Sequence, residues 1–262
     1  MCLILLAWRA HPDYPLVVAA NRDEYYQRPT TPARFWEQAP EILAGRDLSA
    51  GGTWMGVTRH GRFAALTNFR EPLQRPADAP NLPSRGKLVS DFLAGGMKPE
   101  EYLAALLPAA QAYNGFNLIC GTTGQGLWHF SNRGAPARAL EPGIYGLSNH
   151  LLDTPWPKVA QGKSDLARAL KALPADGPLF DLLKDERIHK DDKLPRTGVS
   201  LDWERTLSAA FVRAPNYGTR SSSVVLQDRE GFICFDELTY LPNAAISGRH
   251  RFRFSLQQDR SS

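Results

Sequence analysis

The sequence lacks the residues and spacings on which metal sites and disulfide frameworks depend. Cysteine occurs three times among 262 residues, and no Cys-x-x-Cys pair is present, so neither a disulfide framework nor a zinc site is indicated. The six histidines form no His-x-His or His-x-x-x-His pair, which argues against metal chemistry. We therefore expect no metal and no required cofactor, and we interpret Cys120 and Cys234 as core residues.

Long hydrophobic runs and blocks of like charge are also missing. No stretch approaches the roughly 18 apolar residues of a membrane helix, and the apolar start ends at Arg9, too early for a signal sequence. The net charge of +4 comes from scattered lysines and arginines, which slightly favours anionic ligands and does not indicate nucleic-acid binding. We predict a cytoplasmic protein with no transmembrane segment and a small-molecule ligand or substrate. The oligomeric state stays open.

The composition and the order of the predicted elements indicate one α+β domain over residues 1–262. A chain with 43% hydrophobic and 22% charged residues has enough apolar side chains for one large core. Strands and helices are expected in blocks, which favours an antiparallel sandwich over a doubly wound parallel sheet. The expected strands are 3–6, 16–20, 53–58, 63–68, 116–121, 127–131, 144–148, 220–228, 232–238 and 251–256, helices begin near 84, 99, 157 and 179, and loops span 27–47, 71–83 and 185–200.

Cys2 is the most informative single residue. The initiator Met is normally removed when the next side chain is small, so we expect the mature chain to begin at Cys2 with a free α-amine and a thiol on one residue. An α-amine titrates near ~7.7 to 8.0 and a thiol near ~8.5, so the amine can serve as base for the thiol nucleophile. The apolar run 3–6 is expected to hold this residue at a strand end. The alternative is that Cys2 is a small buried hydrophobic residue.

Four stretches carry a more specific pattern: Asn21-Arg22-Asp23-Glu24, Gly51 to Gly56, Gly146 to Asn149 with Leu152 to Lys158, and Tyr217 to Ser223. In these stretches the chain resembles, over nearly its whole length, the NRDE family, also called the transport and Golgi organisation protein 2 family. The resemblance implies a four-layer αββα sandwich of two antiparallel sheets, of the N-terminal nucleophile hydrolase type. Members of the family are also discussed as carriers of haem or acyl-coenzyme A.

The resemblance gives Asp23 the role of orienting the α-amine of Cys2. In the related choloylglycine hydrolases and penicillin acyltransferases, an Arg-Asn-x-Asp stretch lies at a similar distance from the N-terminal cysteine, and Asp23 matches its aspartate. A carboxylate there would act as the third member of a triad does. The order here is Asn21-Arg22-Asp23, so the arginine is not at the corresponding position. The alternative is a salt-bridge cluster at a strand end.

Asn149, Asn68 and Arg220 complete the predicted catalytic set. Asn149 matches the side-chain oxyanion donor of those relatives, and Asn68 follows a strand where they also place an asparagine. Arg220 matches an arginine near the N-terminal cysteine, where a cation lowers the pKa of the thiol. The alternatives are turn asparagines and an ordinary arginine at a strand end.

The predicted function is hydrolysis or acyl transfer at a carbonyl, most simply at a non-peptide C–N amide of a small molecule. Ligand contacts are expected from Asn21, Arg22, Trp54 and Tyr217, although aromatic residues are more often core. The alternative function is non-catalytic binding or trafficking of haem or acyl-coenzyme A in the same pocket.

Overall fold

The chain forms its strands and helices in blocks, and the structure, a computed structural model, describes residues 2–71 and 82–257. The strands are β1 (Cys2–Trp8), β2 (Leu16–Tyr25), β3 (Thr30–Phe35), β4 (Ile42–Asp47), β5 (Met55–Thr58), β6 (Phe63–Asn68), β7 (Phe116–Thr122), β8 (Gly126–Ser131), β9 (Arg138–Ala139), β10 (Gly143–Leu147), β11 (Tyr217–Gln227), β12 (Phe232–Tyr240) and β13 (Ile246–Ser255). The α-helices are α1 (Gly86–Ala94), α2 (Pro99–Leu106), α3 (Pro157–Ala169), α4 (Gly177–Leu183) and α5 (Leu201–Thr206).

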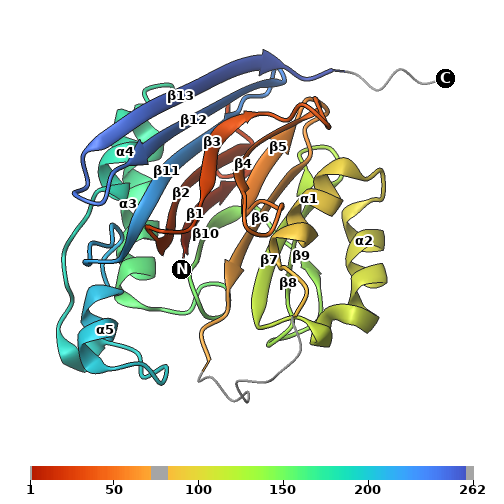
Figure 1. Ribbon diagram of the computed structural model, residues 1–262. Helices are drawn as coiled ribbons and strands as arrows, with labels where there is room; N and C mark the ends of the chain where they lie inside the picture. The colour runs from red at the N-terminus through yellow and green to blue at the C-terminus, as the bar shows by residue number, and fades with distance from the viewer. Residues whose placement is uncertain (1, 72–81, 258–262) are drawn as a thin grey trace.

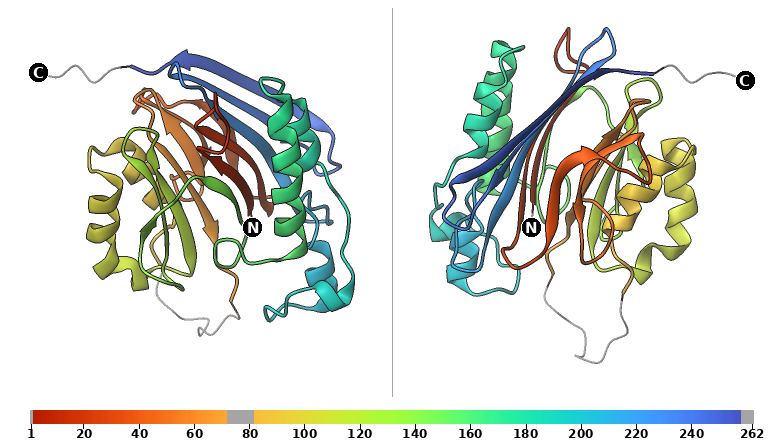
Figure 2. Two further views of the ribbon diagram at one scale, coloured as in Figure 1. Left: turned by 180° about the vertical axis from the view of Figure 1, so that it is seen from behind. Right: turned by 45° about the horizontal axis from the view of Figure 1, so that its top comes forward.

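Two antiparallel sheets lie face to face, and helices cover the outer face of each (Figures 1 and 2). The first sheet has the order β10-β1-β2-β11-β12-β13, with α3 and α4 packed on its outer face. The second has the order β3-β4-β5-β6-β7-β8-β9, with α1 and α2 on its outer face. The four-layer αββα sandwich is therefore confirmed.

Three apolar layers hold these four layers together, and β1 shows how the sequence builds them. Successive side chains of a strand point to opposite faces, and in β1 Leu3 and Leu5 face the helices α3 and α4 while Ile4 and Leu6 face the second sheet. Because both faces are buried, β1 reads as a continuous apolar run. A third cluster joins α1 and α2 to the second sheet.

The predicted loop 27–47 was wrong, because the segment forms the hairpin of β3 and β4. Its alternation is hidden by Pro32, which cannot donate a backbone hydrogen bond. The structure places Pro32 in a register shift between Thr31 and Arg34, on the edge strand of the second sheet, where the missing donor is tolerated.

Two further differences concern the second half of the chain. The helix α5 was not predicted, since only six residues form it. The edge strand β13 begins at Ile246, whereas the predicted strand began at 251. The prediction began too late because the exposed side chains of β13 are polar or charged at alternate positions. Most of the predicted loop 71–83 lies outside the described residues. Within the described residues, no helix combines the length and the apolar character needed to cross a bilayer.

We expect Gly52→Ala to destabilise the protein by about 1 to 3 kcal/mol, because it overpacks a backbone contact. A Cβ on Gly52 would lie 2.5 Å from the carbonyl carbon of Gly86 at the start of α1. Gly96→Ala is the matched control, since a Cβ there meets nothing within 4 Å. Urea unfolding measures both. Equal stabilities would show that α1 does not approach residue 52 this closely.

Candidate active site

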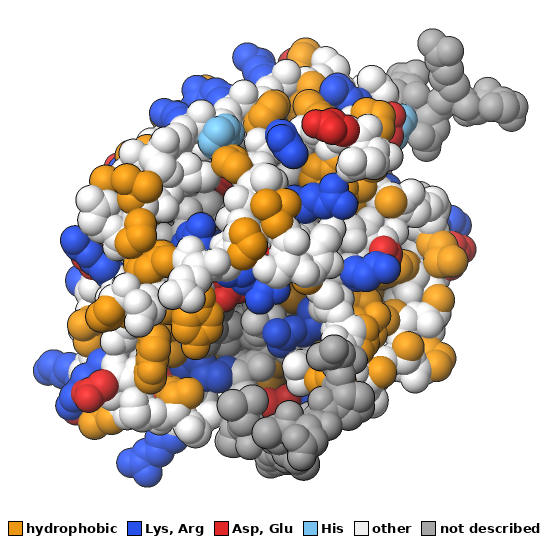
Figure 3. Space-filling view, in the orientation of Figure 1, with side chains coloured by type: hydrophobic (Ala, Val, Ile, Leu, Met, Phe, Trp, Pro, Cys, Tyr) orange, Lys and Arg blue, Asp and Glu red, His pale blue; other side chains and the backbone are white. Residues whose placement is uncertain are grey.

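A cavity of about 320 Å³ lies between the two sheets, at the end where β1 begins. Cys2 and Asp23 of the first sheet and Asn68 of the second line it. On the side of the molecule that faces the viewer in Figure 1, the surface has a hollow with lysine and arginine side chains gathered around it (Figure 3). The charged residues of the cavity wall are Arg22, Asp23, Glu24, Arg28, Asp47 and Arg85. A substrate entering here meets a thiol within a polar, charged wall.

Cys2 is held at the first position of β1, opposite Arg22 of β2. Its carbonyl oxygen accepts a hydrogen bond of 3.1 Å from the hydroxyl of Ser148. Burial raises the pKa of the thiol, the charge of Asp23 raises it further, and Arg22 lowers it. Because burial is the largest of these effects, the resting thiol is neutral and needs a base before it can attack a carbonyl.

Asp23 is buried at 1% exposure on the face of β2 that points toward the helices. Its Oδ1 accepts a hydrogen bond of 2.7 Å from the hydroxyl of Thr219, directly opposite on β11. Its backbone carbonyl accepts another, of 3.0 Å, from the hydroxyl of Tyr217. Burial raises the pKa of the Asp23 carboxyl, and the charge of Lys158 opposes this most strongly.

Lys158 is a functional candidate that the sequence argument passed over. It is the second residue of α3, 3% exposed, and its Nζ has no hydrogen-bond partner among the described residues. Burial lowers the pKa of Lys158 to about 8, while the charges of Asp23 and Cys2 oppose the change. Lysines are rarely buried without a partner, and the charge of Asp23 is the one that most favours its protonated form, so we count this amine with the site. The only sign of it in the sequence was that Lys158 belongs to the stretch 152–158, which carries part of the family resemblance.

Asn68 and Asn149 meet beside the cavity, in different positions. Asn68 ends β6 and lines the cavity wall. Asn149 is fully buried behind it, and its Nδ2 donates a hydrogen bond of 2.8 Å to the carbonyl oxygen of Asn68. Ser148 next to it holds Cys2, so the segment 148–149 fixes the end of β6 relative to the thiol.

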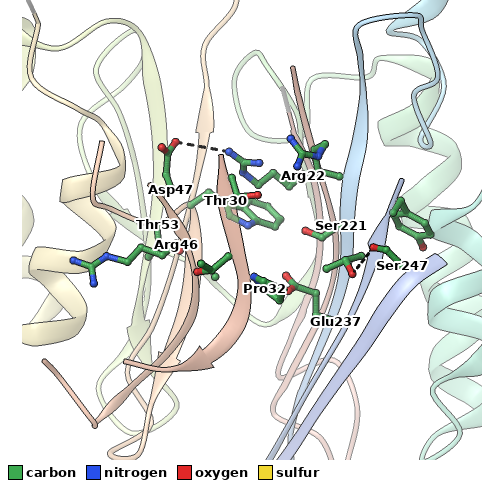
Figure 4. A pocket seen from close by; sticks show the side chains of 15 residues that line it. Arg22, Thr30, Pro32, Arg46, Asp47, Thr53, Ser221, Glu237 and Ser247 are labelled. Carbon is green, nitrogen blue, oxygen red and sulfur yellow. Dashed lines mark hydrogen bonds and ion pairs between the residues drawn. The ribbon is translucent and has the colours of Figure 1, made fainter. Parts of the chain in front are cut away.

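Arg22 and Trp54 line a second cavity as well as the first, and Arg220 lines only the second. This second cavity, of about 200 Å³, is shown in Figure 4. The Nη1 of Arg220 donates hydrogen bonds of 2.9 to 3.1 Å to the carbonyl oxygens of Tyr25, Tyr26 and Arg28. The structure thus brings Cys2, Asp23, Asn68, Arg22 and Trp54 together around the first cavity. Arg220 lies in the wall of the adjoining second cavity.

Asn21 and Tyr217 lie outside the walls of both cavities. The Nδ2 of Asn21 donates to the carbonyl oxygens of Leu183 and Ala210, both at 2.8 Å, and its Oδ1 accepts from Ser222 at 2.6 Å. Tyr217 supports the backbone of Asp23. Their predicted role in ligand binding stays a prediction, and the contacts seen here are structural.

The fold and the site define a class: αββα sandwich proteins with a thiol at the start of a central strand, lining the cavity between the sheets. The sequence profile described as Transport and Golgi organisation 2 matches residues 1–242, and the chain belongs to that family.

Two curated relatives match nearly the full chain. The Transport and Golgi organization 2 homolog of Mus musculus is 37% identical over 98% of this chain and 100% of its own length. The Transport and Golgi organization protein 2 of Drosophila melanogaster is 30% identical over 91% and 92%. Among solved structures, the N-acylethanolamine-hydrolyzing acid amidase ortholog of Caenorhabditis elegans is similar, with 10% identity, a TM-score of 0.49, and coverage of 86% of this chain and 92% of its own.

Lys158→Met tests whether the Lys158 amine is buried. Burial lowers its pKa from 10.5 to about 8. Below about pH 8 the amine is charged in both the folded and the unfolded protein. Between about pH 8 and 10.5 only the unfolded chain binds the proton, so the stability of the folded protein rises with pH. Relative to the variant, we expect the wild type to gain about 3 kcal/mol between about pH 7.5 and 10.5. Urea unfolding at both pH values measures this, and a constant difference would place Lys158 in solvent.

Proposed function

We propose that this protein is an N-terminal cysteine nucleophile that hydrolyses a small-molecule carbonyl compound or transfers its acyl group, most simply acting on a non-peptide C–N amide. The observation that carries the proposal is the position of Cys2. A thiol fixed at a strand start, on the wall of a cavity and one strand away from the buried Asp23, is built for attack on a bound group.

The proposed reaction begins once Met1 has been removed. The α-amine of Cys2 takes the thiol proton, and the sulfur attacks the carbonyl carbon of the substrate. The oxyanion that forms accepts a hydrogen bond from the amide of Asn68, on the cavity wall. The C–N bond then breaks, the departing nitrogen takes the proton from the ammonium, and a thioester remains on Cys2. Water or another acceptor cleaves the thioester, and the thiol is restored.

Asp23 and Lys158 would act on the amine rather than on the substrate. A carboxylate near the new ammonium orients it but also raises its pKa, so that more of the amine is already protonated at neutral pH and cannot accept the thiol proton. The buried cation of Lys158 opposes that effect, as it does for Asp23 itself. We propose that this balance keeps part of the amine neutral near pH 7. Asn149 would serve by positioning Asn68, and its second Nδ2 hydrogen is a further donor.

The alternative is a carrier that binds haem or acyl-coenzyme A in the same cavity without chemistry. The raised pKa of Cys2 favours it, because a neutral thiol is unreactive when no base is present. A reducing compartment keeps a single thiol free, and we propose that the protein is cytoplasmic.

Intact-mass analysis after brief exposure to iodoacetamide, followed by peptide mapping, separates the two functions. We expect a single adduct on Cys2 in a chain that begins at Cys2. Cys234→Ala, which removes the half-buried thiol, should leave that adduct unchanged. Slow labelling of Cys2, together with a haem absorption band that disappears in Cys2→Ala, would support the carrier.

Asp23→Asn tests the oriented amine. The substitution keeps the side-chain volume and removes the charge that orients the amine. We expect the loss of orientation to outweigh the lower thiol pKa that the same change brings, so far-UV circular dichroism should not change while Cys2 is labelled about tenfold more slowly or worse. Rapid labelling of a chain that retains Met1 would contradict the role of the amine. An unfolded Asp23→Asn protein would show that Asp23 serves the fold.

A further inference from the structure

The second cavity lies between β3 and β4 on one side and β11 to β13 on the other (Figure 4). It adjoins the Cys2 cavity, because Arg22, Asp47 and Trp54 line both. Hydroxyl groups dominate the rest of its wall, supplied by Thr30, Thr31, Thr53, Ser221, Thr239 and Ser247. A molecule whose carbonyl lies at Cys2 would reach this polar chamber past the shared residues Arg22, Asp47 and Trp54.

The charges around Arg22 do not balance. Asp47 is bound by Arg28, whose Nε lies 2.6 Å from its Oδ2. Arg22 is only loosely paired, with its Nη2 3.6 Å from Glu24 and 3.8 Å from Asp47. Arg220 has no ion pair within residues 2–71 and 82–257, and after burial the nearby charge of Arg22 lowers its pKa most. Arg22, Arg28 and Arg220 thus face two carboxylates, which leaves one cation uncompensated.

The other charged groups of the wall, Glu237 and Arg46, form no ion pair with these arginines in the described part of the chain. The carboxylate oxygens of Glu237 accept hydrogen bonds from the backbone N–H of Ala33 and the hydroxyl of Ser223. Burial raises the pKa of Glu237, while the hydrogen bonds from Ala33 and Ser223 oppose this change. Arg46 points away from the chamber (Figure 4) and donates to Gln38 and to the carbonyl oxygen of Gly51.

Thr31 gives a second, independent sign of a missing partner. Its Oγ1 is buried and has no hydrogen-bond partner in the described part of the chain, although it lines the cavity. A buried hydroxyl without a partner is costly. An oxyanion in this cavity would accept hydrogen bonds from Thr31 and from the two guanidinium groups, whose planar donor pairs suit carboxylate and phosphate.

We infer that the second cavity binds an anionic oxygen group, a carboxylate or a phosphate, carried by the molecule that reacts at Cys2 and held by Arg22, Arg220 and Thr31. The link to a reacting molecule rests on the proposed function, whereas the anion site itself does not. The substrate class becomes an amide or thioester with an acidic group on the side of the carbonyl that faces Arg22.

Thermal unfolding of Cys2→Ala protein tests the anion site without any chemistry. Inorganic phosphate, compared with chloride at equal ionic strength, should raise the Tm by about 3 °C or more. Adding Arg220→Met or Thr31→Val should abolish or halve this rise, while Arg168→Met, an equal loss of charge on the exposed side of α3, should leave it unchanged. Arg220→Met also breaks three bonds to carbonyl oxygens, so the readout is the phosphate-dependent shift. Thr31→Val breaks no hydrogen bond to the described residues.

A matched pair of haloacetamide probes tests the link to Cys2. The two carry the same short linker and end in a carboxylate or in a neutral carboxamide. The acidic probe should label wild-type Cys2 about tenfold faster than the neutral probe, and Arg220→Met should reduce this ratio of rates to near one.

The outcomes separate the two proposals. A phosphate shift that persists in Arg220→Met and Thr31→Val overturns the anion site. A shift that depends on both residues, with equal labelling by the two probes, supports the site and overturns its link to the reacting molecule. If Arg220→Met moves the pH profile of neutral labelling, Arg220 acts on the thiol and our assignment of it is wrong. Failure of both probes at Cys2 contradicts the proposed function, while the phosphate result still decides the anion site.

Discussion

The burial of the Asp23 carboxylate is the constraint on which the rest of the site depends. Taking a carboxylate out of water costs several kcal/mol unless hydrogen bonds and opposite charge compensate for it. The structure supplies the hydroxyl of Thr219 from β11 and the amine of Lys158 from α3. The outer helix layer is thereby coupled to the candidate site between the sheets, because α3 carries the cation that opposes the cost of burying Asp23.

A single irregularity in β11 directs neighbouring side chains of that strand to two different sites. The register of β11 against β2 shifts between Thr219 and Ser221, so that Arg220 is an extra residue. Such a bulge changes which face the side chains on either side of it reach. Thr219 bonds to Asp23 on the helix side, whereas Arg220 and Ser221 both line the chamber between the sheets. The anion site and the support of Asp23 therefore come from adjacent residues of one strand.

The apolar periodicities predicted most of the fold, and the motif resemblance predicted part of the site. The structure places Cys2, Asp23, Asn68 and Arg22 around one cavity, and each belongs to a strand end that is readable in the sequence, while their roles stay predictions. The hairpin of β3 and β4 was not predicted because Pro32 interrupts the alternating pattern by which an edge strand is recognised. Sequence cannot reveal that Lys158 is buried, since helix lysines usually face water, and the place of Arg220 depends on a bulge that only the strand register shows.

The most direct measurement compares one protein before and after its N-terminus is freed. A chain with a protease-removable extension ahead of Cys2 has the thiol and the cavity but lacks the free α-amine. If that amine is the base, cleavage to expose Cys2 should raise the rate of Cys2 acylation by a small thioester about a hundredfold at neutral pH. Equal rates before and after cleavage, with mass analysis confirming the new terminus, would contradict an N-terminal nucleophile.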